Sequence, residues 1–282
     1  MKRIVAVTGS TGRQGGAVVR ALIGAEGFEV RALTRRPVRP GQVACDLEDP
    51  RPVRAALEGA DALFLTTTPY EGGTDAEERQ ARNAIDAARA AGVGQIVYSS
   101  VADARAGTGV AHYDSKGRIE ALLDDGGFTA VTILRPTFFM DMVLADSFRR
   151  SLARGRIEMA MRPHSRITMI AVDDIAAFAA LAFAQPAALH GHVIDLAGDD
   201  PDMTDIAAAM ADAVGHPVAY RQVPPDRMAG DVRPKATTQR WLEDVGWQID
   251  IAALTMSYPI PLTNLRQWAQ RHGAALAGVP ER

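Results

Sequence analysis

The sequence predicts an α/β fold with a doubly wound parallel sheet and a smaller, interleaved C-terminal lobe. Three observations lead to it. Short apolar runs alternate with amphipathic stretches through the first hundred residues, as is typical of parallel strands covered by helices on both faces. A glycine-rich loop directly follows the first run. The chain has 282 residues, 47% of them apolar, so it is long enough for one large domain or for a main domain with a smaller one.

The expected strands of the main sheet are Arg3–Val7, Phe28–Leu33, Gln42–Ala44, Ala62–Leu65, Gln95–Tyr98 and Thr129–Leu134. The clearest helix between them is predicted at Asp75–Ala91, because its alanines and isoleucine recur at helical spacing. A second helix is expected at Tyr113–Asp124. After Phe138 the alternation loosens, but a helix at Asp173–Ala184 and a strand at His192–Leu196 are expected to return to the sheet, and a last helix lies near Leu262–His272.

Composition excludes several classes of protein. Thirty-one basic and 34 acidic residues leave a net charge of -3, which gives no electrostatic basis for binding nucleic acid. Cys45 is the only cysteine, so an intrachain disulfide cannot form and a reducing cytoplasm is expected. The apolar start is too short for a signal peptide and no 18-residue apolar run appears, so we expect neither export nor a membrane span. The six histidines lack ligand spacing, so no metal site is expected.

The glycine loop is the strongest functional motif. Gly9, Gly12 and Gly15 are spaced G-x-x-G-x-x-G between the first strand and a helix. Gly9 is expected to allow the turn, Gly12 a close backbone approach, and Gly15 the packing of the helix on the sheet. Free amide groups and the positive helix end attract a pyrophosphate. The segment therefore predicts dinucleotide binding.

The end of the second strand indicates which dinucleotide is preferred. No Asp or Glu stands there to accept bonds from a ribose; the strand is followed by Arg35 and Arg36. Arginines hold a 2′-phosphate bidentately, which favours NADP(H) over NAD(H), although a solvated arginine pair is an alternative. Asp46 and Leu47, after the third strand, are expected beside the adenine, with a simple capping role as the alternative for Asp46.

These motifs lead to a division of the chain. We expect an NAD(P)-binding unit at residues 1–150, with residues 168–198 returning to the same sheet. Residues 199–282 are expected to form the smaller, substrate-side lobe.

Several segments, taken together and in order, resemble the NmrA-like family of atypical short-chain dehydrogenase/reductases. They are Thr8–Gly16, Leu33–Arg35, Ala90–Val101, His112–Glu120 and Thr132–Met140, about half of the chain. The resemblance implies an NAD(P)-binding Rossmann fold. It further implies cofactor contacts from Thr11, Gly12, Arg13, Gln14 and Gly15 to the phosphates, from Arg35 to the 2′-phosphate, from Thr66, Thr67 and Thr68 near the ribose, and from Lys116, Pro136, Phe138 and Phe139 near the nicotinamide.

The family pattern is altered at the expected catalytic residues. Short-chain dehydrogenases use a Tyr four residues before a Lys as the proton donor, whereas here His112 holds that position before Lys116 and Tyr113 is three residues before it. These three side chains are the catalytic candidates. Ser99 and Ser100 end a strand where a substrate-orienting hydroxyl is expected, or they only satisfy backbone groups there. Ser99 is also a cofactor-binding candidate.

Lys116 has a second argument in its favour. Only three of the 31 basic residues are lysines, so a lysine inside His112–Lys116 indicates a need for a compact ammonium, as in bonding two ribose hydroxyls. An ordinary exposed lysine is the alternative. For His112 the alternative is a hydrogen bond to a backbone carbonyl.

Two functions fit these residues. One is an NADPH-dependent reductase of quinones, azo compounds or other flat, electron-poor molecules, which accept hydride without strong acid assistance. The other is a non-enzymatic NADP(H) redox sensor that regulates a protein partner. A sugar-nucleotide epimerase is disfavoured by the His at position 112. The expected partners are a small-molecule substrate or a regulated protein, and the expected assembly is a monomer or a homodimer.

Overall fold

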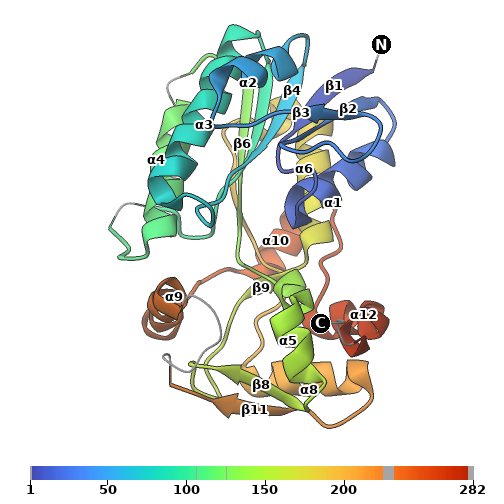
Figure 1. The fold of residues 1–282 in the computed structure, drawn as a ribbon, viewed down its shortest axis with the longest axis vertical. Coiled ribbons are helices and arrows are strands. Elements are labelled where there is room, and N and C mark those ends of the chain that lie inside the picture. Colours follow the sequence, from blue (N-terminus) through green and yellow to red (C-terminus); the bar gives the residue numbers. More distant parts are fainter. Residues whose placement is uncertain (1, 106, 125, 225–231, 279–282) are drawn as a thin grey trace. The chain divides into compact units, whose positions relative to one another are not determined.

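The computed structural model describes residues 2–105, 107–124, 126–224 and 232–278. The chain divides into two compact units (Figure 1). The first consists of residues 1–136 and 175–195, and the second of residues 137–174 and 196–282. The functional division at residues 150 and 199 stays a prediction, and the parts of the expected lobe at 225–231 and 279–282 lie outside the described residues.

The first unit is built on a seven-stranded sheet in the order β10-β6-β5-β4-β1-β2-β3. Its strands are β1 (Arg3–Val7), β2 (Phe28–Thr34), β3 (Gln42–Ala44), β4 (Ala62–Thr66), β5 (Gln95–Ser99), β6 (Ala130–Pro136) and β10 (Val193–Leu196). The pairings from β3 through β6 are parallel. The strand order reverses between β1 and β4, which is where open α/β sheets bind ligands. The doubly wound prediction is confirmed, including the return of β10 to the sheet.

Helices cover both faces of this sheet. They are α1 (Arg13–Ile23), α2 (Pro50–Leu57), α3 (Gly73–Ala90), α4 (Ala111–Asp124), α6 (Val172–Ala184) and the short α7 (Pro186–Leu189). Successive strand side chains point to opposite faces. Ala6 of β1 packs in a cluster with Ile85 of α3 and Ile119 of α4, whereas Val5 and Val7 are buried on the other face, where α1 and α6 lie (Figure 1).

Hydrogen bonds also hold the end of α6 to the sheet, at the amino ends of the strands. Arg3 donates from Nη1 to the Phe183 carbonyl at 2.6 Å, and from Nη2 to Gln95 at 2.8 Å. The Gln95 amide in turn donates to the Ala182 carbonyl at 2.7 Å. These bonds hold the end of α6 to β1 and β5.

The strand ends differ from the sequence prediction in a consistent way. The strands β2, β4 and β5 each continue one residue further than predicted, to Thr34, Thr66 and Ser99. Apolar periodicity does not extend to these residues, because their side chains are polar and lie at the carboxyl edge. The carboxyl edge of such a sheet is where open α/β folds bind ligands.

The second unit contains two small parallel sheets, β7-β9 and β8-β11. Its elements are β7 (Phe138–Phe139), the 3-10 helix η1 (Met140–Leu144), α5 (Asp146–Leu152), β8 (Arg156–Met159), β9 (Met169–Ile170), α8 (Met203–Val214), β11 (Ala219–Gln222), α9 (Val232–Asp244), α10 (Ile251–Ser257), α11 (Leu265–Arg271) and α12 (Gly273–Ala277). The helix predicted near Leu262–His272 begins at Leu265, because the Asn264 side chain caps it by accepting from the Gln267 amide. Within the described ranges, no helix has the length and apolar character needed to cross a bilayer.

Candidate functional site

The loop after β1 has the backbone that its glycines predict. Gly9 has φ +60°, a conformation that disfavours other residues. A Cβ added to Gly15 would lie 2.3 Å from the Gly9 carbonyl oxygen, so α1 packs directly on the loop backbone. A Cβ on Gly12 would lie 3.2 Å from the same oxygen. Substitution of Gly15 is therefore the least tolerable of the three on steric grounds.

The first turn of α1 carries no side-chain cap. Gly12 occupies the N-cap position without a side-chain hydrogen bond, and no acidic residue lies in the first turn. In α2, by contrast, the Asp49 carboxylate accepts from the Arg51 amide at 3.0 Å. An uncapped helix start presents free amides and the positive end of the helix dipole. The loop and the start of α1 therefore fit the pyrophosphate of a dinucleotide.

Hydrogen bonds tie this loop to three neighbouring strand ends. The Thr8 hydroxyl donates to the Thr66 carbonyl at 3.0 Å and accepts from the Thr66 amide at 2.8 Å. The Ser10 hydroxyl donates to the Leu33 carbonyl at 2.7 Å. The Ser99 hydroxyl donates to the Gln14 side chain at 2.5 Å. The loop is thus held to β4, β2 and β5.

The end of β2 differs from the sequence analysis in one respect. No carboxylate directly follows β2 in the sequence, but the structure brings Glu71 to Arg35 from the loop between β4 and α3. Arg35 Nη1 donates to Glu71 Oε2, and Nη2 donates to Glu71 Oε1 at 2.9 Å. Both side chains are about 60% exposed. Arg36 lies beside them, with its amide donating to the Thr34 hydroxyl at 3.4 Å.

The residues predicted beside the adenine and the ribose have hydrogen-bond partners within the first unit. The Asp46 carboxylate accepts from the Glu48 amide at 3.0 Å, but the residue that caps α2 is Asp49. The Leu47 carbonyl accepts from Asn83 at 2.8 Å, and the Thr68 hydroxyl accepts from the Tyr70 amide at 3.4 Å. Contact of Asp46, Leu47 or Thr68 with a coenzyme stays a prediction.

Lys116 is buried, so the alternative of an ordinary exposed lysine is wrong. Only 7% of the Lys116 surface is exposed, and Lys116 Nζ lies 3.0 Å from Glu77 Oε1. The ammonium also donates to the Thr67 carbonyl at 3.0 Å and to the Ser99 carbonyl at 3.4 Å. The Tyr98 ring centroid is 5.3 Å away. Lys116 therefore binds the strand ends of β4 and β5 to α3 and α4.

Glu77 is the functional candidate that sequence reasoning missed. It is 0% exposed and also accepts from the Ser115 hydroxyl at 2.6 Å. One signal was present in the sequence: Glu77 lies one helical turn before Ala81, at the start of the apolar stripe of α3. A carboxylate in a buried stripe requires a buried partner.

The electrostatics of the three catalytic candidates are set by burial. Burial lowers the pKa of the Lys116 ammonium, and the Glu77 carboxylate opposes that shift. Burial and the Lys116 charge lower the pKa of the half-buried His112, against the Glu77 carboxylate, which raises it. Burial raises the pKa of Tyr113, whose ring lies edge-on to His112 at 4.5 Å. A lysine-assisted tyrosine acid requires a lowered tyrosine pKa, so that arrangement is not built here.

The remaining candidates lie at the sheet edge or in the second unit. The Ser100 hydroxyl is buried and has no hydrogen-bond partner within the described part of the chain, so it is available to a ligand. Pro136 ends β6 and its carbonyl accepts from the Ala102 amide at 3.0 Å. Phe138 and Phe139 form β7 in the second unit, and their approach to the nicotinamide stays a prediction.

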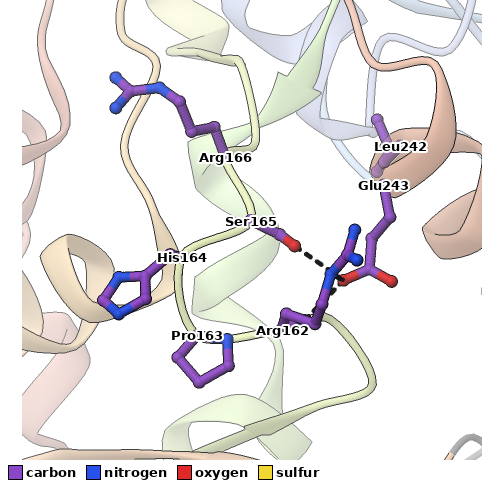
Figure 2. Close-up of a pocket in the computed structure, with 7 residues that line it drawn as sticks. All are labelled: Arg162, Pro163, His164, Ser165, Arg166, Leu242 and Glu243. Carbon is purple, nitrogen blue, oxygen red and sulfur yellow. Dashed lines mark hydrogen bonds and ion pairs between the residues drawn. The ribbon is translucent and has the colours of Figure 1, made fainter.

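A pocket in the second unit contains none of the predicted site residues (Figure 2). Its charged side chains are paired with neighbours. Glu243 accepts from the Ser165 hydroxyl at 2.7 Å and lies 3.3 Å from Arg162, as Figure 2 shows. Arg166 pairs with Asp200 at 2.6 Å. These contacts neutralise the pocket, so we place the candidate site at the carboxyl edge of the first unit's sheet.

Two further observations concern the chemistry of the cysteine and of metal binding. Cys45 is buried, and desolvation raises the pKa of its thiol to about 11, so the thiol is protonated near neutral pH. Among the residues that the structure describes, no group of three or more His, Cys, Asp and Glu side chains is placed to hold a metal ion.

Comparison with known proteins gives a family match and named relatives. A model of the NmrA-like family matches residues 1–239. Quinone oxidoreductase 2 of Escherichia coli (strain K12) is 29% identical over 231 residues, which cover 78% of each chain. NAD(P)H azoreductase of Xenophilus azovorans is 30% identical over 232 residues, which cover 77% of this chain and 76% of the azoreductase.

A solved structure is similar over almost the whole chain. The crystal structure of the E. coli NADPH-dependent quinone oxidoreductase complexed with NADPH matches with a TM-score of 0.79 at 25% identity. The match covers 95% of this chain and 99% of that one.

Proposed function

Because the chain belongs to the NmrA-like family, we propose that it binds NADP(H) at the glycine loop and reduces quinone-like or other flat, electron-poor small molecules. The reduced nicotinamide supplies the hydride when bound. The relatives that support this proposal are named as a quinone oxidoreductase and an azoreductase. Arg35 at the end of β2 supports NADP(H) over NAD(H).

The observation that carries the choice of substrate class is the lack of a matched acid among the three candidates. The Tyr113 pKa is raised, the His112 pKa is lowered, and the Lys116 ammonium is engaged by Glu77. A general acid is most effective when its pKa lies near the working pH. A simple ketone needs such an acid, whereas a quinone accepts hydride without one.

The protein's own residues then act mainly by binding and orientation. The amides of the glycine loop hold the phosphates, and Lys116 with Glu77 fixes Thr67 and Ser99 beside the expected ribose. Positioning two reactants in this way supplies much of the rate in such a reaction. Of the two candidate proton donors, His112 is the more accessible, because Tyr113 is buried.

The test is turnover of NADPH with matched acceptors, followed at the reduced-nicotinamide absorbance band. We expect turnover with quinones or an azo dye, and at least about 100-fold lower kcat/KM with simple ketones. His112→Gln and Tyr113→Phe should each lower quinone kcat less than about tenfold, because a lost general acid would cost more. His164→Gln, at an exposed histidine of the second unit, is the matched control.

Three outcomes would count against the proposal. A loss of 100-fold or more in either variant would identify a required acid and contradict the acid-free argument. Tight NADPH binding without turnover of any acceptor would favour the redox sensor, which the reductase names of the relatives do not support. Failure to bind either coenzyme would remove the whole proposal.

A further inference from the structure

Arg35 and Glu71 form a bidentate ion pair at the end of β2. Arg35 Nη1 and Nη2 each bind one carboxylate oxygen of Glu71. The same pair of guanidinium N–H groups is the geometry that holds two oxygens of a phosphate. Glu71 therefore occupies the binding edge of the arginine that the proposed function assigns to the 2′-phosphate.

The surrounding charges reinforce the pair. The Glu71 carboxylate raises the pKa of Arg35, with a smaller contribution from Asp46. The Arg35 guanidinium lowers the pKa of Glu71, and Arg36 adds to that effect. Glu71 is consequently ionised near neutral pH. A phosphate arriving at Arg35 meets a carboxylate of the same sign that is already bound.

NAD(H) does not meet this obstacle. It has a hydroxyl at the 2′ position, and a hydroxyl can donate a hydrogen bond to a carboxylate. Asp and Glu at the end of the second strand commonly play this role in NAD-binding proteins. Glu71 presents such a carboxylate at this strand end, although it comes from the loop that follows β4.

We propose that Glu71 is a specificity-determining residue that competes with the adenosine 2′-phosphate for Arg35 and so narrows this chain's preference for NADP(H) over NAD(H). The inference rests on the proposed function. Both side chains are about 60% exposed, so the pair opens at small cost and NADPH binding is weakened but not prevented. The effect of Glu71 on the NADPH dissociation constant is then only a few-fold.

The experiment measures the dissociation constants of NADPH and NADH by calorimetric titration. We expect Glu71→Gln to tighten NADPH roughly two- to fivefold and to leave NADH unchanged or weaker. Asp212→Asn removes the same charge from a similarly exposed pair with Arg266 in the second unit, and should change neither constant. Raising the ionic strength should shrink the difference between wild type and Glu71→Gln.

A second variant tests whether the effect passes through Arg35. In an Arg35→Met background, Glu71→Gln should no longer tighten NADPH, because the competed group is absent. If Glu71→Gln tightens NADPH equally with and without Arg35, the effect is general electrostatics and the inference is overturned. It is also overturned if Glu71→Gln leaves the NADPH/NADH ratio unchanged. Wild type that binds neither coenzyme refutes the proposed function itself, which keeps the two failures distinguishable.

Discussion

Removing the cation from the Glu77–Lys116 pair should destabilise the first unit strongly. Glu77 is inaccessible and Lys116 nearly so, and their charged atoms are 3.0 Å apart. Breaking a buried pair by removing one partner costs about 3–5 kcal/mol, since the other charge stays buried without compensation. For a chain of this size we expect Lys116→Met to lower the melting temperature by roughly 6 to 20 °C.

The protein contains its own control for this prediction. Glu78 and Arg118 lie on the same two helices and pair at 2.6 Å, but the Arg118 side chain is half exposed. Arg118→Met should therefore cost about 1 kcal/mol or less. Urea unfolding followed by circular dichroism measures both variants.

A double variant separates a lost attraction from an uncompensated charge. Glu77→Leu with Lys116→Met removes both charges, so it should regain most of the stability that either single variant loses. Two results would refute the reasoning: a Lys116→Met protein within about 1 kcal/mol of wild type, or additive losses in the double variant.

The remaining predictions concern the loop, the cysteine and the coenzyme. Gly15→Ala should lower the free energy of unfolding in urea by about 1–3 kcal/mol or more, since its Cβ would lie 2.3 Å from the Gly9 carbonyl oxygen. Gly24→Ala is the control and should be tolerated, because a Cβ on Gly24 has no neighbour closer than 3.5 Å. Burial raises the pKa of the Cys45 thiol to about 11, so the stability that the protonated thiol contributes is present below pH 9 and is lost as the pH rises toward 11. Relative to Cys45→Ala, the free energy of unfolding of the wild type should fall by roughly 2 to 3 kcal/mol over that window. Arg35→Ala should weaken NADPH binding by about 1.5–3 kcal/mol more than NADH binding in titrations, and equal losses would contradict the 2′-phosphate assignment.

Local patterns were sufficient to predict the sheet and the glycine loop. The apolar run predicted β1 with the observed bounds, because parallel strands buried on both faces are nearly continuous in apolar residues. The edge strand β3 also has its predicted bounds, although its residues are only partly buried or exposed. The spacing of Gly9, Gly12 and Gly15 predicted the turn at Gly9 and the close packing at Gly15, since the positive φ of Gly9 and the contacts of Gly12 and Gly15 with the Gly9 carbonyl oxygen are local.

The charged partners could not be predicted in the same way. Glu71 reaches Arg35 across 36 residues, and Glu77 reaches Lys116 across 39 residues. Each contact depends on β4 pairing beside β1, or on α3 packing beside α4. A sequence window of one helix or one strand contains only one member of each pair, so it shows a charge without showing its partner.

The order in which this chain leaves the ribosome matters for its coenzyme-binding half. Translation of residues 1–150 completes β6 but not its neighbour β10. The strand β10 begins some 40 residues later, after the rest of the second unit's first segment, residues 137–174, has been made. Until then the outer edge of β6 presents unpaired amides and carbonyls, a template for aggregation, and Gln95 lacks the Ala182 carbonyl. A truncated protein made for crystallography or screening should therefore carry residues 175–196 spliced after residue 136.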